Sequence, residues 1–165
     1  MKKKVLISAC LLGKNCRYNG GHSHLQELDA LDVDWLPVCP EEEGGLETPR
    51  SPAEMQADAD SILKGAGSVV TNEEHDVTVE FIRGAEESLK TGIKSGVEYA
   101  ILKSRSPSCG LGKVYDIPLE NQKIGIVPSK KWKKNNLGES WYPGETLISA
   151  IGQGFVLTNP LQLAN

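Results

Sequence analysis

The sequence has no apolar run approaching the roughly 18 residues of a membrane-spanning helix. It also has no excess of positive charge: the formal net charge is −4, which argues against a general nucleic-acid binder. A C-x-x-C pair, the usual signature of thiol redox enzymes, is missing as well. Repeats, low-complexity tracts and linkers are absent, so the 165 residues suit a single domain with a sizeable core.

Four cysteines are present, at positions 10, 16, 39 and 109. We expect the chain in the cytoplasm, where thiols stay reduced and serve as ligands or catalysts more often than as disulfides. The first cysteine ends the stretch LISAC, which resembles the box before a lipid-modified cysteine. Its apolar run, residues 5–9, is shorter than the roughly 7 to 15 residues of an export signal. We therefore interpret residues 4–9 as a buried strand.

Strand and helix patterns alternate along the chain. The expected elements are a strand at 4–9, a short helix at 24–31, a strand at 35–38, a proline-stiffened loop at 47–54, a minor strand at 68–71, a helix from Asp76 to Gly96, a strand at 98–103, a helix at 144–151 and a strand at 155–157. This order is typical of a doubly wound α/β domain. We predict one domain over residues 1–165, with a mainly parallel, roughly four-stranded, Rossmann-like sheet and helices on both faces.

Three of the cysteines follow predicted strands. Cys10 follows the first strand, Cys39 the second, and Cys109 lies just beyond the third. The carboxyl ends of parallel strands meet at one edge of a sheet, where ligands bind at the point of strand-order reversal. The topology therefore predicts that these three thiols converge in one crevice, with Cys16 in the loop after Cys10.

The residue pattern leaves three interpretations of the cysteines open. Each could be a small buried hydrophobe, as free cysteines often are. A zinc site is disfavoured because the closest pair has the spacing C-x5-C, whereas zinc sites use tighter pairs. An iron–sulfur cluster accepts thiolates from scattered loops. Three cysteine ligands to a four-iron cluster would leave one iron open as a Lewis acid.

Polar side chains lie next to the cysteines in the sequence. Glu41 follows Cys39 by two residues and is a candidate general acid or base. Glu42 and Glu43 are interpreted as a solvated acidic run. Two hydroxyls, of Ser106 and Ser108, precede Cys109.

Four stretches together resemble the thiouracil desulfidase family of small bacterial proteins. They are CLLGKNCRYNG at 10–20, CPEEEGGLETPRSP at 39–52, DVTVEFIRGA at 76–85 and LKSRSPSCG at 102–110. The resemblance extends over about residues 4–157, nearly the whole chain. It implies an oxygen-sensitive [4Fe-4S] cluster and the conversion of 2-thiouracil to uracil with release of sulfide, without net electron transfer.

Carried over to this chain, the resemblance also implies roles for single residues. They are cluster ligation by Cys10, Cys39 and Cys109, catalysis by Glu41 and Ser106, and substrate binding by Ser108 and Cys16. Two alternatives stay open: Cys16 could replace one of the three ligands, and either serine could be the one that acts. The expected partner is a thiolated pyrimidine. The basic segment at 129–145 leaves thiolated nucleotides or tRNA as alternative substrates, although RNA contact is the less favoured expectation. A non-catalytic iron–sulfur or zinc sensor is the alternative function, and the sequence predicts no oligomeric state.

Overall fold

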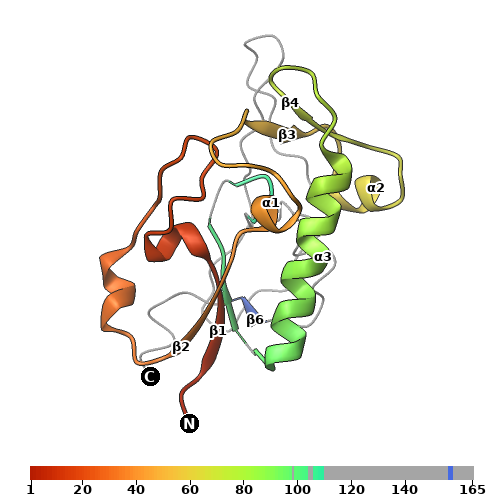
Figure 1. Cartoon of the computed structure of the whole chain (residues 1–165). Helices are drawn as coiled ribbons and strands as arrows, with labels where there is room; N and C mark the ends of the chain where they lie inside the picture. The colour runs from red at the N-terminus through yellow and green to blue at the C-terminus, as the bar shows by residue number, and fades with distance from the viewer. Residues whose placement is uncertain (98, 104–105, 110–155, 158–165) are drawn as a thin grey trace, which may run out of the picture.

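A computed structural model describes most of the first two thirds of the chain (Figure 1). The described residues are 1–97, 99–103, 106–109 and 156–157. Among these residues, no helix is both long and apolar enough to span a bilayer. The helix predicted at 144–151 and the basic segment at 129–145 lie outside the described residues.

The main sheet is parallel and has the strand order β2-β1-β5-β6. Its strands are β1 (Lys4–Ser8), β2 (Asp34–Val38), β5 (Tyr99–Ile101) and the two-residue β6 (Val156–Leu157). All residues of β1 after Lys4 are buried, as expected for a central parallel strand that is covered on both faces. The chain passes from β1 to β2 on one side and returns to β5 on the other. The strand order therefore reverses between β1 and β5, where a ligand crevice is expected.

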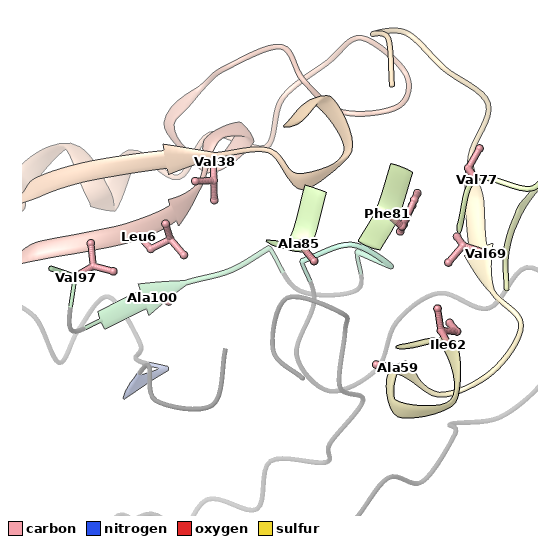
Figure 2. Packing of buried hydrophobic residues seen from close by; sticks show 10 residues of the cluster. All are labelled: Leu6, Val38, Ala59, Ile62, Val69, Val77, Phe81, Ala85, Val97 and Ala100. Atoms are coloured by element: carbon pink, nitrogen blue, oxygen red, sulfur yellow. The ribbon is translucent and has the colours of Figure 1, made fainter. Parts of the chain in front are cut away.

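Alternate residues of β1 enter two separate cores. Leu6 packs with Val38 and with Phe81 and Ala85 of α3 (Thr78–Ser95), in the cluster that Figure 2 shows. On the other side of the strand, Val5 and Ile7 pack with the 3₁₀ turns η1 (Ala9–Leu12) and η2 (Gln26–Ala30). The period of two in a strand explains this division.

Two helices cross at very short distance beside the end of β2. The single-turn helix α1 (Pro40–Glu43) begins directly after Cys39, with Pro40 in its first turn, and lies against α3 in Figure 1. A Cβ atom on Gly84 would lie 1.7 Å from the carbonyl oxygen of Pro40, and one on Gly44 would lie 2.0 Å from that of Glu80. The two glycines thus let the backbones touch and fix the position of α1.

A small antiparallel sheet lies near the N-terminal end of α3 (Figure 1). It consists of β3 (Ala53–Met55) and β4 (Val69–Thr71), and the short helix α2 (Ala59–Leu63) lies between them in sequence. The predicted minor strand at 68–71 is thereby confirmed, but as part of a second sheet. The predicted loop at 47–54 is wrong at its end, because β3 begins at Ala53.

Other elements differ from the prediction in detail. The helix predicted at 24–31 is the 3₁₀ turn η2, and neither α1 nor α2 was expected. The long helix is confirmed, and Gly96 ends it in the left-handed region with φ of 66°. At its start, the Asp76 carboxylate accepts a hydrogen bond of 2.9 Å from the backbone N–H of Thr78.

Candidate functional site

The structure brings the four thiols together beyond the carboxyl edge of the parallel sheet. Cys10 lies in η1, Cys39 directly after β2, and Cys109 in the turn that follows β5. Cys16 lies near Cys10 and Cys39 and interacts with the thiols of both, and the Cys39 thiol donates to the Cys16 carbonyl at 3.6 Å. The convergence that the topology predicts for Cys10, Cys39 and Cys109 is therefore present, and Cys16 joins it.

The thiols differ in acidity because they donate hydrogen bonds in one direction. The Cys16 thiol donates to Cys10, which lowers the pKa of Cys10 and raises that of Cys16 to about 11. A hydrogen bond to Cys16 and then burial raise the pKa of Cys39. Burial raises the pKa of Cys109 to about 11. Cys10 is thus the thiol that ionises first in the metal-free protein.

Backbone and hydroxyl groups hold the ends of β1 and β5 in place. The hydroxyl of Ser8, the last residue of β1, accepts a hydrogen bond of 2.8 Å from the backbone N–H of Lys103. The same hydroxyl hydrogen-bonds to the thiol of Cys109. On the other side of the site, the Cys10 carbonyl accepts the N–H of Ser23 at 2.8 Å. Ser8 had no part in the sequence prediction.

A chain of hydroxyls leads to the carboxylate of Glu41. Glu41 Oε1 accepts a hydrogen bond of 2.7 Å from Ser108 Oγ, and Ser108 Oγ lies 3.1 Å from Ser106 Oγ. A carboxylate only accepts, so the Ser108 hydrogen is committed to Glu41. The Ser106 hydroxyl must then donate to Ser108, while it accepts the backbone N–H of Cys109 at 3.2 Å. The order of donation is Ser106 to Ser108 to Glu41.

Arg50 pairs with the other oxygen of the same carboxylate. Its Nε forms an ion pair with Glu41 Oε2, and both side chains are largely buried. The sequence prediction treated this arginine only as part of the stiff loop at 47–54. Its one signal is the pattern PRSP, in which Pro49 and Pro52 enclose a cation and restrain the loop.

The acidic run beside Glu41 is not simply solvated, and that prediction was wrong. Glu42 accepts hydrogen bonds from Lys14 at 2.5 Å and from Thr48 at 2.8 Å. Burial alone would raise the pKa of Glu42, but these two partners lower it overall. The half-buried Glu43 accepts a hydrogen bond from Ser88 of α3, and burial raises its pKa. Each of the three carboxylates thus holds a different segment.

The donor set fits an iron–sulfur cluster better than a single metal ion. Within the described residues, no three His, Cys, Asp or Glu side chains are already arranged to hold a metal ion. The thiols instead surround one place from segments far apart in sequence, and thiolates are the ligands of iron–sulfur clusters. Zinc sites usually draw pairs of ligands from one tight loop, which this site lacks.

Known proteins resemble nearly the whole chain. The family model described as 2-thiouracil desulfurase matches residues 5–136, somewhat less than the extent expected from the motifs. The uncharacterized protein YbbK of Bacillus subtilis (strain 168) is 37% identical over 123 residues, which are 73% of this chain and 82% of YbbK. The solved structure of the [4Fe-4S]-dependent thiouracil desulfidase TudS has a TM-score of 0.73 and 36% identity, over 98% of this chain and 93% of that chain.

A local likeness of another kind also occurs. The peptidoglycan D,D-transpeptidase MrdA of Salmonella typhimurium (strain SL1344) is 37% identical over 54 residues. The matched part is 33% of this chain but only 9% of that enzyme. So small a share of the transpeptidase supports no inference about its activity in this chain.

Proposed function

This chain belongs to the 2-thiouracil desulfurase family, and on that premise we propose that it converts 2-thiouracil to uracil and hydrogen sulfide. The reaction replaces sulfur by the oxygen of water and needs no net transfer of electrons. The observation that carries the proposal is the hydrogen bond from Ser108 to Glu41, which places a carboxylate and two hydroxyls beside clustered thiols.

We propose that the thiols of Cys10, Cys39 and Cys109 hold a [4Fe-4S] cluster. TudS, which shares 36% of its residues with this chain, is described as dependent on such a cluster. When bound, a cluster with one iron free of cysteine supplies a Lewis acid for a thiocarbonyl sulfur. Cys16 is the fourth thiol of the group, and we propose that it faces the substrate.

Glu41 acts as the general base in this proposal. Its carboxylate takes the proton of the attacking water through Ser108, because Ser108 is 4% exposed and already donates to Glu41. Ser106 is less deeply buried and stands at the far end of the hydroxyl chain. We therefore propose that Ser106 contacts the substrate and that Ser108 passes the proton to Glu41. The expectation from sequence was the reverse, with catalysis by Ser106 and substrate binding by Ser108.

The substitution Glu41→Gln tests this assignment. It keeps the size of the side chain but removes the base, so turnover should fall by about 10²- to 10⁴-fold. The measurement is sulfide release from 2-thiouracil under anaerobic conditions, normalised to the iron and acid-labile sulfide of each preparation. Iron content should match the wild type, and full activity in this variant would refute the role of Glu41.

Glu42→Gln is the matched control. It makes the same chemical change one residue further on, where the carboxylate contacts Lys14 and Thr48 and neither serine. Its turnover should stay within about threefold of the wild type. An equal loss in both variants would show that helix α1 has shifted, and not that a base was removed.

The substrate and the function class are tested in one panel. We propose a free thiolated pyrimidine, and thiolated nucleosides and tRNA serve as competitors in the same sulfide assay. Faster sulfide release from thiolated tRNA than from the free base would show that RNA is the substrate. A preparation that contains iron but releases no sulfide would favour the alternative of a non-catalytic sensor.

We also propose that residues 1–165 form one doubly wound domain and that the protein is located in the cytoplasm. The support is the parallel strand order and the two cores on opposite sides of β1. The four cysteines are free thiols, which suits a reducing compartment.

A further inference from the structure

We propose that Arg50 is a positioning residue: it aims the Glu41 carboxylate at Ser108 and fixes the Cys16 loop against the same site. The inference rests on the proposed function, because it assigns Arg50 an effect through Glu41. Arg50 lies within the stretch at 39–52 that carries the resemblance, but no role was assigned to it there. Its importance follows from the contacts that its guanidinium makes.

All three guanidinium nitrogens of Arg50 are engaged. Nε pairs with Glu41 Oε2, one terminal nitrogen donates to the Cys16 carbonyl at 2.9 Å, and the other donates to Thr48 Oγ1 at 2.9 Å and the Glu47 carbonyl at 3.1 Å. Only 9% of the Arg50 side chain and 13% of that of Glu41 are exposed. Such shielding makes a charge-assisted pair strong and costly to break.

The Arg50 pair fixes the plane of the Glu41 carboxylate, so that one oxygen faces Ser108. Because Arg50 holds Oε2, Oε1 is the oxygen that accepts from Ser108 at 2.7 Å. Without this anchor the carboxylate group is free to rotate about its last single bond. Any rotation other than a half turn, which only exchanges two equivalent oxygens, moves the accepting oxygen away from Ser108. The proton path from Ser106 therefore depends on a residue that contacts the carboxylate but neither serine.

The same guanidinium ties together segments that are distant in sequence. It reaches the Cys16 loop through the carbonyl, and it reaches the segment after Cys39 through Glu41. The Glu41 carboxylate then reaches the turn of Cys109 through Ser108. The Arg50 backbone N–H also donates to the Tyr18 carbonyl at 2.8 Å, so its own loop is fixed.

Arg50→Lys and Arg50→Gln test the proposal in the cluster-loaded enzyme. Lysine keeps the charge but has no planar fork to reach Glu41 and Cys16 together. We expect kcat per bound iron to fall by about 10- to 100-fold in Arg50→Lys, as for partners that orient a ligand or a base. The KM for 2-thiouracil should change by less than about threefold, and iron content should match the wild type, whereas the metal-free chain should unfold at a lower temperature because contacts of a buried ion pair are lost.

Arg83→Lys is the matched control. Arg83 is an exposed residue that also donates to the α1 region, with a terminal nitrogen 3.3 Å from the Gly44 carbonyl oxygen, and it forms no hydrogen bond or ion pair with Glu41. Its kcat should stay within about threefold of the wild type. A loss equal to that of Arg50→Lys would show that any arginine beside α1 matters, and would overturn the proposal.

A double-mutant cycle with Glu41→Gln separates positioning from general support. If Arg50 acts through Glu41, then Glu41→Gln/Arg50→Gln releases sulfide as slowly as Glu41→Gln alone, measured over long single-turnover incubations. If the two losses multiply, Arg50 acts independently and the proposal fails. Should Arg50→Gln not fold, the cycle is run with Arg50→Lys, and failure of both variants to fold would assign Arg50 a structural role only.

Failure of the proposed function gives a different result. If Glu41→Gln alone keeps full turnover, the base assignment is wrong and Arg50 has nothing to position. If Glu41→Gln is inactive and Arg50→Lys keeps the wild-type kcat, only the Arg50 inference is overturned.

Discussion

One hydroxyl, that of Ser8, joins the ends of two strands below the thiols. It accepts the N–H of Lys103, at the end of the segment that follows β5, and hydrogen-bonds to Cys109. Ser8 is 1% exposed, so water cannot replace either partner. The position of Cys109 relative to β1 therefore depends on this side chain.

Ser8→Ala should destabilise the metal-free protein by about 0.5 to 1.5 kcal/mol, because the hydrogen bond between the Ser8 hydroxyl and the Lys103 N–H is lost. Urea unfolding followed by circular dichroism measures the change. Ser23→Ala is the control, since the Ser23 contact to Cys10 is made by the backbone and survives the substitution. Equal stability of Ser8→Ala and wild type would contradict the role.

Single residues also show where the sequence was insufficient. The motif order indicated Glu41, Ser106 and Ser108 correctly as neighbours of the thiols, because each lies within three residues of a cysteine. Arg50 lies 34 residues from Cys16, to which it donates, and only the fold brings them together. The binding of Glu43 to Ser88 likewise joins positions 45 residues apart. Contacts of this range leave no local pattern.

At the scale of elements, the crossing of α1 and α3 depends on two glycines. Glycine in a helix interior is usually less stable than alanine by about 0.5 to 1 kcal/mol. At Gly84 this preference is reversed, since a Cβ would lie 1.7 Å from the Pro40 carbonyl. The backbones must separate to admit it, which displaces α1 and Glu41.

Gly84→Ala should therefore destabilise the protein by about 1 to 3 kcal/mol, the range for overpacked cores, and lower turnover as well. Thermal unfolding and the sulfide assay measure the two effects. Glu86→Ala, on the exposed side of the same helix, should stay within about 0.5 kcal/mol of the wild type. A stabilised Gly84→Ala would show that helix propensity dominates and that the crossing adapts.

The hydrogen bonds at the start of α3 predict that the stability of the folded protein depends on pH. Hydrogen bonds from Thr78 lower the pKa of Asp76 below its ordinary value of 3.8. A lowered pKa in the folded state means that the contribution to stability is present above the unfolded value and is lost as the pH falls through the folded one. Because the Asp76 carboxylate is exposed to solvent, Asp76→Ala should cost only about 0.5 kcal/mol at pH 7.

The comparison is urea unfolding of wild type and Asp76→Ala at pH 7 and at about pH 2.5. The difference between the two proteins should shrink as the pH falls toward the lowered pKa of the folded state, because the Asp76 carboxylate then takes up a proton. The exposed Glu73→Ala controls for loss of a nearby charge. A difference that is independent of pH would show that Asp76 acts through packing and not through its charge.

Short elements explain most of the errors in the predicted fold. α1 has four residues and β3 has three, too few for a helical or strand period to be recognised. α3 has 18 residues and was predicted with its stop at Gly96. The strands β1, β2 and β5 were also predicted, because continuous apolar runs mark buried parallel strands.

Considered as a whole, the molecule gathers its thiols from three strand ends. The order β2-β1-β5 places these ends next to one another, which explains why the topology alone predicted the convergence. It does not decide which of the four thiols bind iron. Cys16 interacts with the thiols of Cys10 and Cys39 and is at least as buried as either of them.

Four single Cys→Ser variants decide the ligand set. Serine at position 10, 39 or 109 should remove most of the cluster, whereas Cys16→Ser should keep wild-type iron and lose affinity for 2-thiouracil. Iron and sulfide analysis after anaerobic reconstitution measures the first effect, and KM measures the second. Cys16→Ser could instead lose iron while one of the other three variants stays fully loaded. That result would show that Cys16 is a ligand and that the cysteine replaced in the loaded variant is not.

The parallel pairing of β1 with β5 also bears on how the protein is made. Lys103 and Cys109 complete the site from a segment that leaves the ribosome long after Cys10, Cys16 and Cys39. A nascent chain without β5 has the first three thiols but neither the neighbouring strand of β1 nor the third proposed ligand. The proposed cluster site is therefore complete only after Cys109 has been synthesised and β5 has paired with β1.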